Sequence, residues 1–162
     1  MAREPDWLDP AGLQICWLND KTPPGLFSAS GGLTVWVVDT VDGPHGVRLS
    51  EGDGQFLIWK LEPGFNHSGV HLGPVELQLD VRTIEMPDNM PEAGDLDLQG
   101  DTVTLIGASS RGYIRAPTLV VGRLSPAGEH PLSFRCAHWS LVRVSGEDRK
   151  IVFEHPSGAD PE

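Results

Sequence analysis

One stretch of the sequence decides the fold class: Val75-Glu76-Leu77-Gln78-Leu79-Asp80-Val81-Arg82. Its apolar residues have odd numbers and its polar residues have even numbers, so the pattern repeats every second residue. Side chains alternate between the two faces of a β-strand, whereas an α-helix repeats every ~3.6 residues. The stretch therefore predicts a strand with one apolar face and one polar face.

Two other stretches extend this prediction. The run Leu33-Thr34-Val35-Trp36-Val37-Val38 is apolar on both faces, which is typical of a central strand in a layered sheet. In 132–144 the apolar residues change parity twice, which predicts one long strand with bulges. Separated by Gly/Pro turn signals, the expected strands cover 12–18, 33–41, 45–50, 55–62, 74–84, 95–99, 102–107, 112–123, 132–144 and 150–154.

Length and proline content set the architecture. The chain has 162 residues, which is the usual size of one domain, and its 14 prolines leave few places for long helices. Only 9–18 has an alternative as a helix, because Asp9 suits a cap and Pro10 a first helical position. We expect an all-β fold, an antiparallel β-barrel or β-sandwich of about ten short strands with little helix. Residues 1–162 form one domain, with loosely ordered tails at 1–8 and 156–162.

Charge and cysteine content exclude several function classes. The net charge is −11, from 12 basic and 23 acidic residues, and nucleic-acid binding depends on basic residues that neutralise phosphates. No apolar run is long enough for a signal peptide or a membrane span. With two cysteines there is no disulfide framework, so we expect a cytoplasmic protein. No GxGxxG or P-loop motif occurs, and we expect no cofactor.

The polar face of the deciding stretch gives the candidate ligand site. If Glu76, Gln78, Asp80 and Arg82 line a cavity, the carboxylates need cationic partners, because an unpaired buried charge is costly. The available partners from neighbouring strands are Arg115, Arg123 and Arg143. No pattern identifies a catalytic residue. The candidate ligand-binding residues are Glu76, Asp80, Arg82, Arg115, Arg123, Arg143 and His138.

A metal site has a candidate ligand set, but its spacing is unfavourable. His67, His71 and Glu76 carry donor atoms that suit iron or zinc. Residues four apart on a strand are separated by ~13 Å, too far to bind one ion. We therefore expect no metal unless the chain curls at Gly69.

These observations leave three hypotheses for function. The leading one is a protein that binds a small organic ligand, either as a simple binding protein or as a cofactor-free enzyme on a small metabolite. The alternative is an acidic interaction module, such as an inhibitor, immunity-type protein or accessory subunit, that docks a basic protein. The acidic stretch between Glu85 and Asp101 would then form an exposed docking face. The third is a metal-dependent β-barrel enzyme.

Overall fold

The computed structural model of the protein describes residues 14–29, 31–40, 43–64, 67–86, 92–99, 102–109, 112–119 and 134–156. Most of these residues lie in strands, and only Val81–Thr83 form a short 3-10 helix. The strands form antiparallel ladders in two sheets, and neither sheet closes into a barrel within the described ranges. The prediction of an antiparallel all-β fold is therefore confirmed, in a sandwich-like form.

The larger sheet contains most of the strands. Its main path runs in the order β1-β6-β2-β3-β11-β10-β9-β12-β8, and β4 and β5 continue from the other side of β3. The strands of this sheet are β1 (Gln14–Leu18), β2 (Gly25–Ala29), β3 (Leu33–Thr40), β4 (Gly43–Arg48), β5 (Ile58–Lys60), β6 (His67–Gly73), β8 (Ile84–Glu85), β9 (Leu96–Gln99), β10 (Thr102–Ser109), β11 (Gly112–Leu119) and β12 (Phe134–Cys136). Sequence neighbours are often separated in this order, so the pairing could not be predicted from the order of the strands along the chain.

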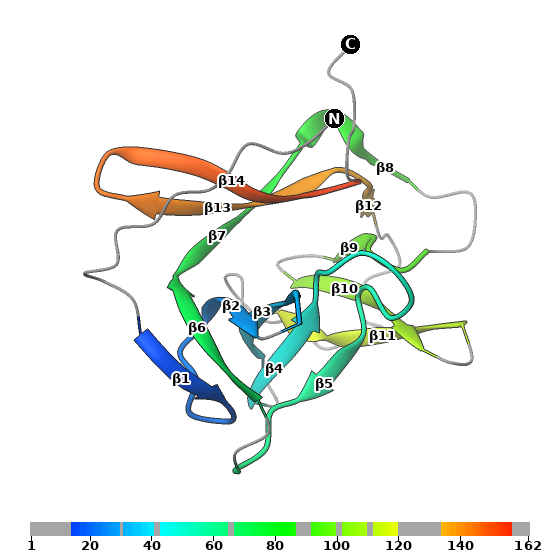
Figure 1. Cartoon of the computed structure of the whole chain (residues 1–162). Coiled ribbons are helices and arrows are strands. Elements are labelled where there is room, and N and C mark those ends of the chain that lie inside the picture. Colours follow the sequence, from blue (N-terminus) through cyan, green and yellow to red (C-terminus); the bar gives the residue numbers. More distant parts are fainter. Residues whose placement is uncertain are drawn as a thin grey trace.

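The smaller sheet has three strands in the order β14-β13-β7. They are β7 (Val75–Leu79), β13 (Trp139–Ser145) and β14 (Asp148–His155). Figure 1 shows β13 and β14 lying across one side of the larger sheet. The chain enters this sheet from β6 and from β12, and leaves β7 for β8 through a 3-10 helix, Val81–Thr83. The two sheets are thus joined by three short connections.

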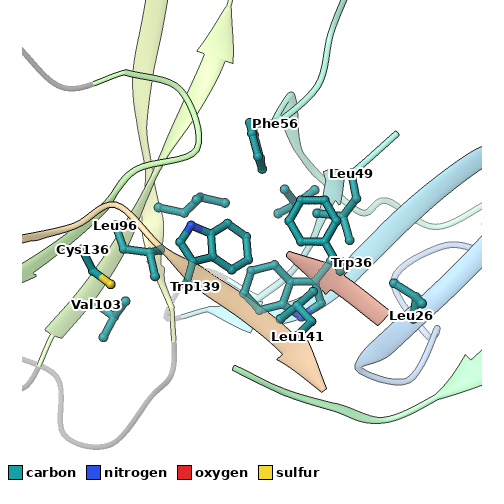
Figure 2. Close-up of a cluster of buried hydrophobic side chains, with 12 residues drawn as sticks. Leu26, Trp36, Leu49, Phe56, Leu96, Val103, Cys136, Trp139 and Leu141 are labelled. Carbon is teal, nitrogen blue, oxygen red and sulfur yellow. The ribbon is translucent and has the colours of Figure 1, made fainter. Parts of the chain in front are cut away.

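Strand β3 is buried on both faces, as its sequence predicts. Trp36 belongs to the main core between the sheets, which also contains Trp139 and Leu141 of β13 (Figure 2). Val35 and Val37, which are 0% and 1% exposed, belong to a second core on the opposite face of the sheet. An alternating strand can supply two cores in this way because successive side chains point to opposite faces.

The two parity changes in 132–144 have separate causes. The first, after Cys136, marks the passage from β12 in the larger sheet to β13 in the smaller one. The second coincides with a register shift between Leu141 and Val142 in the β13–β14 ladder. The segment is therefore two strands and a bulge rather than one strand, and the break between the strands places His138 in the connection.

The sequence patterns missed two strands, β2 and β6. Strand β2 follows Pro23 and Pro24, and β6 contains Gly69 and Gly73, which are residues that usually mark turns. Both strands are well paired, β6 with β1 and β2, and β2 also with β3. Pairing on both sides supplies the stability that local propensity does not.

Three other expectations concern the ends of the chain and the membrane. The alternative helix over 9–18 is wrong for its second half, because Gln14–Leu18 is a strand, and 9–13 lies outside the described residues. Apart from Pro156, the predicted tails at 1–8 and 156–162 also lie outside them. In the part of the chain that the structure describes, no helix has the length and apolar character needed to cross a membrane.

Candidate functional site

The candidate site lies where two connections between the sheets meet. Asp80 follows β7, and His138 lies between β12 and β13. The backbone N–H of Asp80 donates to the carbonyl of His138 at 2.9 Å, and the backbone N–H of His138 donates to Thr83 Oγ1 at 3.2 Å. These two bonds, one between backbones and one to the Thr83 hydroxyl, fix the two connections relative to each other.

Asp80 is held by Arg82. Its carboxylate accepts hydrogen bonds from the Arg82 backbone N–H at 3.0 Å, from Nε at 3.0 Å and from Nη2 at 2.9 Å. The hydrogen bonds from the Arg82 side chain and backbone hold the pKa of Asp80 well below its ordinary value, with a smaller contribution from His138 and against an opposing effect of burial. The Asp80 side chain is 16% exposed, whereas that of Arg82 is 83% exposed and covers the carboxylate from the solvent side. Asp80 is therefore an ionised and well-oriented acceptor.

His138 lies between two carboxylates. Its Nδ1 is 3.1 Å from Asp80 Oδ2, and its Nε2 is 2.8 Å from Glu154 Oε1 of β14. Because neutral imidazole donates from only one nitrogen, both hydrogen bonds form at once only when the ring carries two protons. The two ring nitrogens point in opposite directions, so the carboxylates lie on opposite sides of the ring and do not converge on one point.

The thiol of Cys136 lies close to this site but does not contact the imidazole. Its Sγ donates to the backbone carbonyl of His138 at 3.1 Å, and the residue is fully buried. A buried thiol bonded to a carbonyl is typical of a structural cysteine rather than a nucleophile.

A hollow of about 210 Å³ opens beside His138 on the smaller sheet. Its walls combine carboxylates, imidazole, amide and hydroxyl groups with a few apolar side chains. The lining residues are Gln78, Leu79, Asp80, His138, Trp139, Ser140, Ile151 and Glu154. The site thus offers hydrogen-bond donors and acceptors along an apolar wall, which is the usual composition of a small-molecule pocket.

Three of the predicted site residues, Asp80, Arg82 and His138, come together here. Glu76 does not join them, because Glu76 and Gln78 are exposed on the outer face of β7. The carboxylate of Glu76 pairs with Arg149 at 3.2 Å, which is not one of the predicted partners. The polar row of β7 therefore lines no enclosed cavity, and only its last members contribute to the site.

The predicted arginine partners lie elsewhere or outside the description. Arg143 belongs to β13, opposite Val75. The backbone of Arg115 lies in β11 opposite Ile106, and its side chain is outside the described part of the molecule. Arg123 lies outside the described residues altogether.

The metal candidates occupy an extended strand. His67 is exposed at the start of β6, whereas His71 is 7% exposed and uses both ring nitrogens, with Nε2 donating to the Pro23 carbonyl and Nδ1 accepting from the Gly73 N–H. Over the described ranges, no three His, Cys, Asp or Glu residues are grouped so that they could hold a metal ion. His71 is a core histidine that fixes the Pro23 and Gly73 backbones.

The expectation of an exposed acidic face is wrong for part of its stretch. Asp97 is only 4% exposed, and the carboxylate of Asp95 faces Arg135 at 3.7 Å. The cause is the pairing of β9 with both β10 and β12, which makes Leu96–Gln99 an internal strand rather than a rim.

Glu154 is the site residue that the sequence patterns missed. The signal was available, because the turn after Ser145 sets the register of the hairpin and the parity change at Val142 shifts it by one residue. Together they place Glu154 opposite Ser140, two residues from His138.

Neither a known protein family, nor a curated protein, nor a solved structure matches the chain.

Proposed function

We propose that the protein binds a small polar organic molecule in the pocket beside His138. One observation carries this proposal: Asp80, His138 and Glu154, from three separate segments, form a hydrogen-bonded row at an open hollow. Clusters of ionisable groups in a hollow are more frequent at functional sites than elsewhere.

The size and lining of the pocket limit the ligand. A volume of about 210 Å³ corresponds to roughly seven water molecules at ~30 Å³ each, so the ligand has about seven to ten non-hydrogen atoms. Carboxylate acceptors, the Gln78 amide and the Ser140 hydroxyl favour a ligand that carries hydroxyl or ammonium groups. Ile151 and Leu79 supply an apolar surface for its carbon skeleton.

The same arrangement supports proton transfer without a cofactor. Arg82 fixes Asp80, and Asp80 orients His138 through Nδ1, which leaves Nε2 facing Glu154, another lining residue of the pocket. An oriented imidazole is the usual general base of cofactor-free enzymes when one ring nitrogen carries no proton, so the proposal requires that Nε2 is released from Glu154 and unprotonated. A ligand hydroxyl that replaces Glu154 at Nε2 would be in hydrogen-bond contact with that nitrogen. Glu154 is the replaceable partner, since its side chain is 31% exposed, and its displaced carboxylate then accepts a hydrogen bond from a second hydroxyl or ammonium group of the ligand.

The test is a fragment screen by two-dimensional NMR with small polyols, amino alcohols and hydroxy acids, followed by titration of each hit. We expect hits that shift the Gln78 side-chain amide and the Ser140 backbone amide signals. Glu154→Gln should weaken the best hit about tenfold, the loss of one charge-assisted hydrogen bond of ~1.4 kcal/mol. The matched control is Glu147→Gln, an exposed position in the turn between β13 and β14, which should not change the affinity.

Two results would contradict the proposal. One is a library in which no compound shifts the pocket signals. The other is a hit whose affinity is the same in wild type, Glu154→Gln and Glu147→Gln. Any hit that passes both criteria is then assayed for chemical change after prolonged incubation, which separates an enzyme from a binding protein.

As a further part of this proposal, the protein is cytoplasmic and does not bind nucleic acid. It is supported by a net charge of −11 and by two free cysteines, Cys16 and Cys136. The acidic docking module has less support, because Asp95 and Asp97 do not form an exposed acidic face.

A further inference from the structure

A second, larger hollow of about 560 Å³ lies at the corner where the chain passes from β6 to β7. It has no lining residue in common with the pocket beside His138. Its walls come from the start of β2, from β3 and from the start of β7, so both sheets contribute. The volume lies within the ~300–1,000 Å³ that is usual for pockets of organic ligands.

The interior of this groove is apolar. Trp36, which is 5% exposed, and Val38 line it from β3, and Val75 and Leu77 line it from β7. All four pack against the main core, so the groove is an opening onto the core rather than a surface depression. An aromatic or branched aliphatic group would gain burial against these side chains.

Two acidic residues are among the lining residues of the groove, and each alternates with its apolar lining residues, so their carboxylates lie at the rim and not in the apolar interior. Asp39 and Glu76 are both exposed. Glu76 pairs with Arg149 at 3.2 Å, but their side chains are 54% and 56% exposed, so this ion pair contributes little and is readily exchanged. A ligand ammonium group can therefore take the place of the guanidinium.

The sheet edge at the groove is also open. The β2–β3 ladder ends at Gly25 and Val37, and the next partner of β3 on that side is Leu119 of β11, opposite Thr40. Between these points no described strand pairs with Val38 or Asp39 on the β2 side. The backbone there can hydrogen-bond a ligand without breaking a ladder.

We propose that this groove binds an amphiphilic organic amine. Its aromatic or aliphatic body packs on Trp36, Val75 and Leu77, and its ammonium group lies by the carboxylates of Asp39 and Glu76. The indole adds a further attraction for a cation close to its face. This proposal is independent of the ligand proposed for the His138 pocket.

The test uses three probes of the same shape: 4-phenylbutylamine, 4-phenylbutanol and 4-phenylbutyrate. Titration calorimetry should give the amine an affinity about tenfold above that of the alcohol, because two exposed ion pairs of up to ~1 kcal/mol each separate them. The anion should bind more weakly still. The affinity of the amine should fall as the salt concentration rises.

Variants locate the site. The double variant Asp39→Asn/Glu76→Gln should reduce the affinity for the amine to that for the alcohol, and Asp53→Asn, an exposed aspartate outside the groove, should leave it unchanged. Val38→Phe fills the groove and should abolish binding of all three probes in a protein whose circular dichroism remains unchanged. Equal affinities for amine and anion, or an affinity that the double variant and Val38→Phe leave intact, would overturn the proposal.

Discussion

Trp139→Phe tests the centre of the core. Trp139 is 1% exposed, and its indole N–H donates to the buried carbonyl of Gly94 at 2.7 Å. The ring lies 5.4 Å from Phe153 and 6.0 Å from Trp36, measured between centroids. Phenylalanine keeps an aromatic ring at this position but removes the N–H and part of the ring volume.

Two costs add up in this variant. Leaving the Gly94 carbonyl without its donor costs ~1–3 kcal/mol, and the smaller ring costs a further ~1–2 kcal/mol in lost burial and residual cavity. The free energy of unfolding should therefore fall by about 2–5 kcal/mol, which lowers the melting temperature by about 4–20 °C for a chain of this size. Urea unfolding followed by circular dichroism measures both the free energy and its slope.

Trp36→Phe is the matched control. Trp36 is 5% exposed in the same core and loses the same ring atoms, but it does not donate to Gly94. We expect a loss of only ~1–2 kcal/mol for this variant. If the two variants differ by less than ~0.5 kcal/mol, the hydrogen bond makes no net contribution and the reasoning is refuted.

The other predictions concern a glycine and two titratable groups. Gly94→Ala should lower the free energy of unfolding by at least ~2 kcal/mol, because φ is +98° and a Cβ would lie 2.8 Å from the His155 ring. The control is Gly31→Ala, which has a φ of +82° but open space around the Cβ, and it should lower the free energy by only ~1 kcal/mol in the same thermal unfolding experiment. Burial lowers the pKa of His155, so as the pH falls the imidazole is protonated in the unfolded chain before it is protonated in the folded protein. The free energy of unfolding should therefore decrease as the pH falls below ~6.5. Urea unfolding between pH 7.5 and 5 should show a smaller decrease for His155→Phe than for the wild type. Arg82 lowers the pKa of Asp80, so the contribution of Asp80 to the free energy of unfolding should be complete above pH ~3.9 and should be lost as the pH falls further. If stability decreases with acid in the same way for Asp80→Asn and for the wild type, this assignment is contradicted.

Alternation and parity predicted the strands that have one clear environment on each face. Strand β3 and strand β7 follow their patterns, and the parity changes near Cys136 and Val142 mark a change of sheet and a bulge. These features are local, since they depend only on which neighbours of a residue are apolar. They were sufficient for the fold class.

Pairing between distant strands could not be predicted in the same way. Strand β6 pairs with β1 and β2 through backbone hydrogen bonds, which no side-chain pattern specifies, and Gly69 is required only by the close approach of the Ser28 carbonyl of β2, so the glycines and histidines of β6 gave no signal. The burial of Asp97 likewise follows from the pairing of β9 on both sides, not from its own composition. For the site, the sequence supplied Asp80, Arg82 and His138 as separate candidates, but their contact depends on how two connections cross between the sheets.

The burial of β3 on both faces also determines how the molecule opens. Amide protons of its buried central residues, Val35 to Val37, can exchange with solvent only when both cores separate, so their exchange should report global unfolding. Strand β14 is one of the two edge strands of the smaller sheet, and its Ile151 is 52% exposed, so a local opening there needs far less disruption. Glu154 belongs to that edge strand, so the carboxylate that a ligand displaces from His138 lies in a strand that opens more readily than the centre of β3.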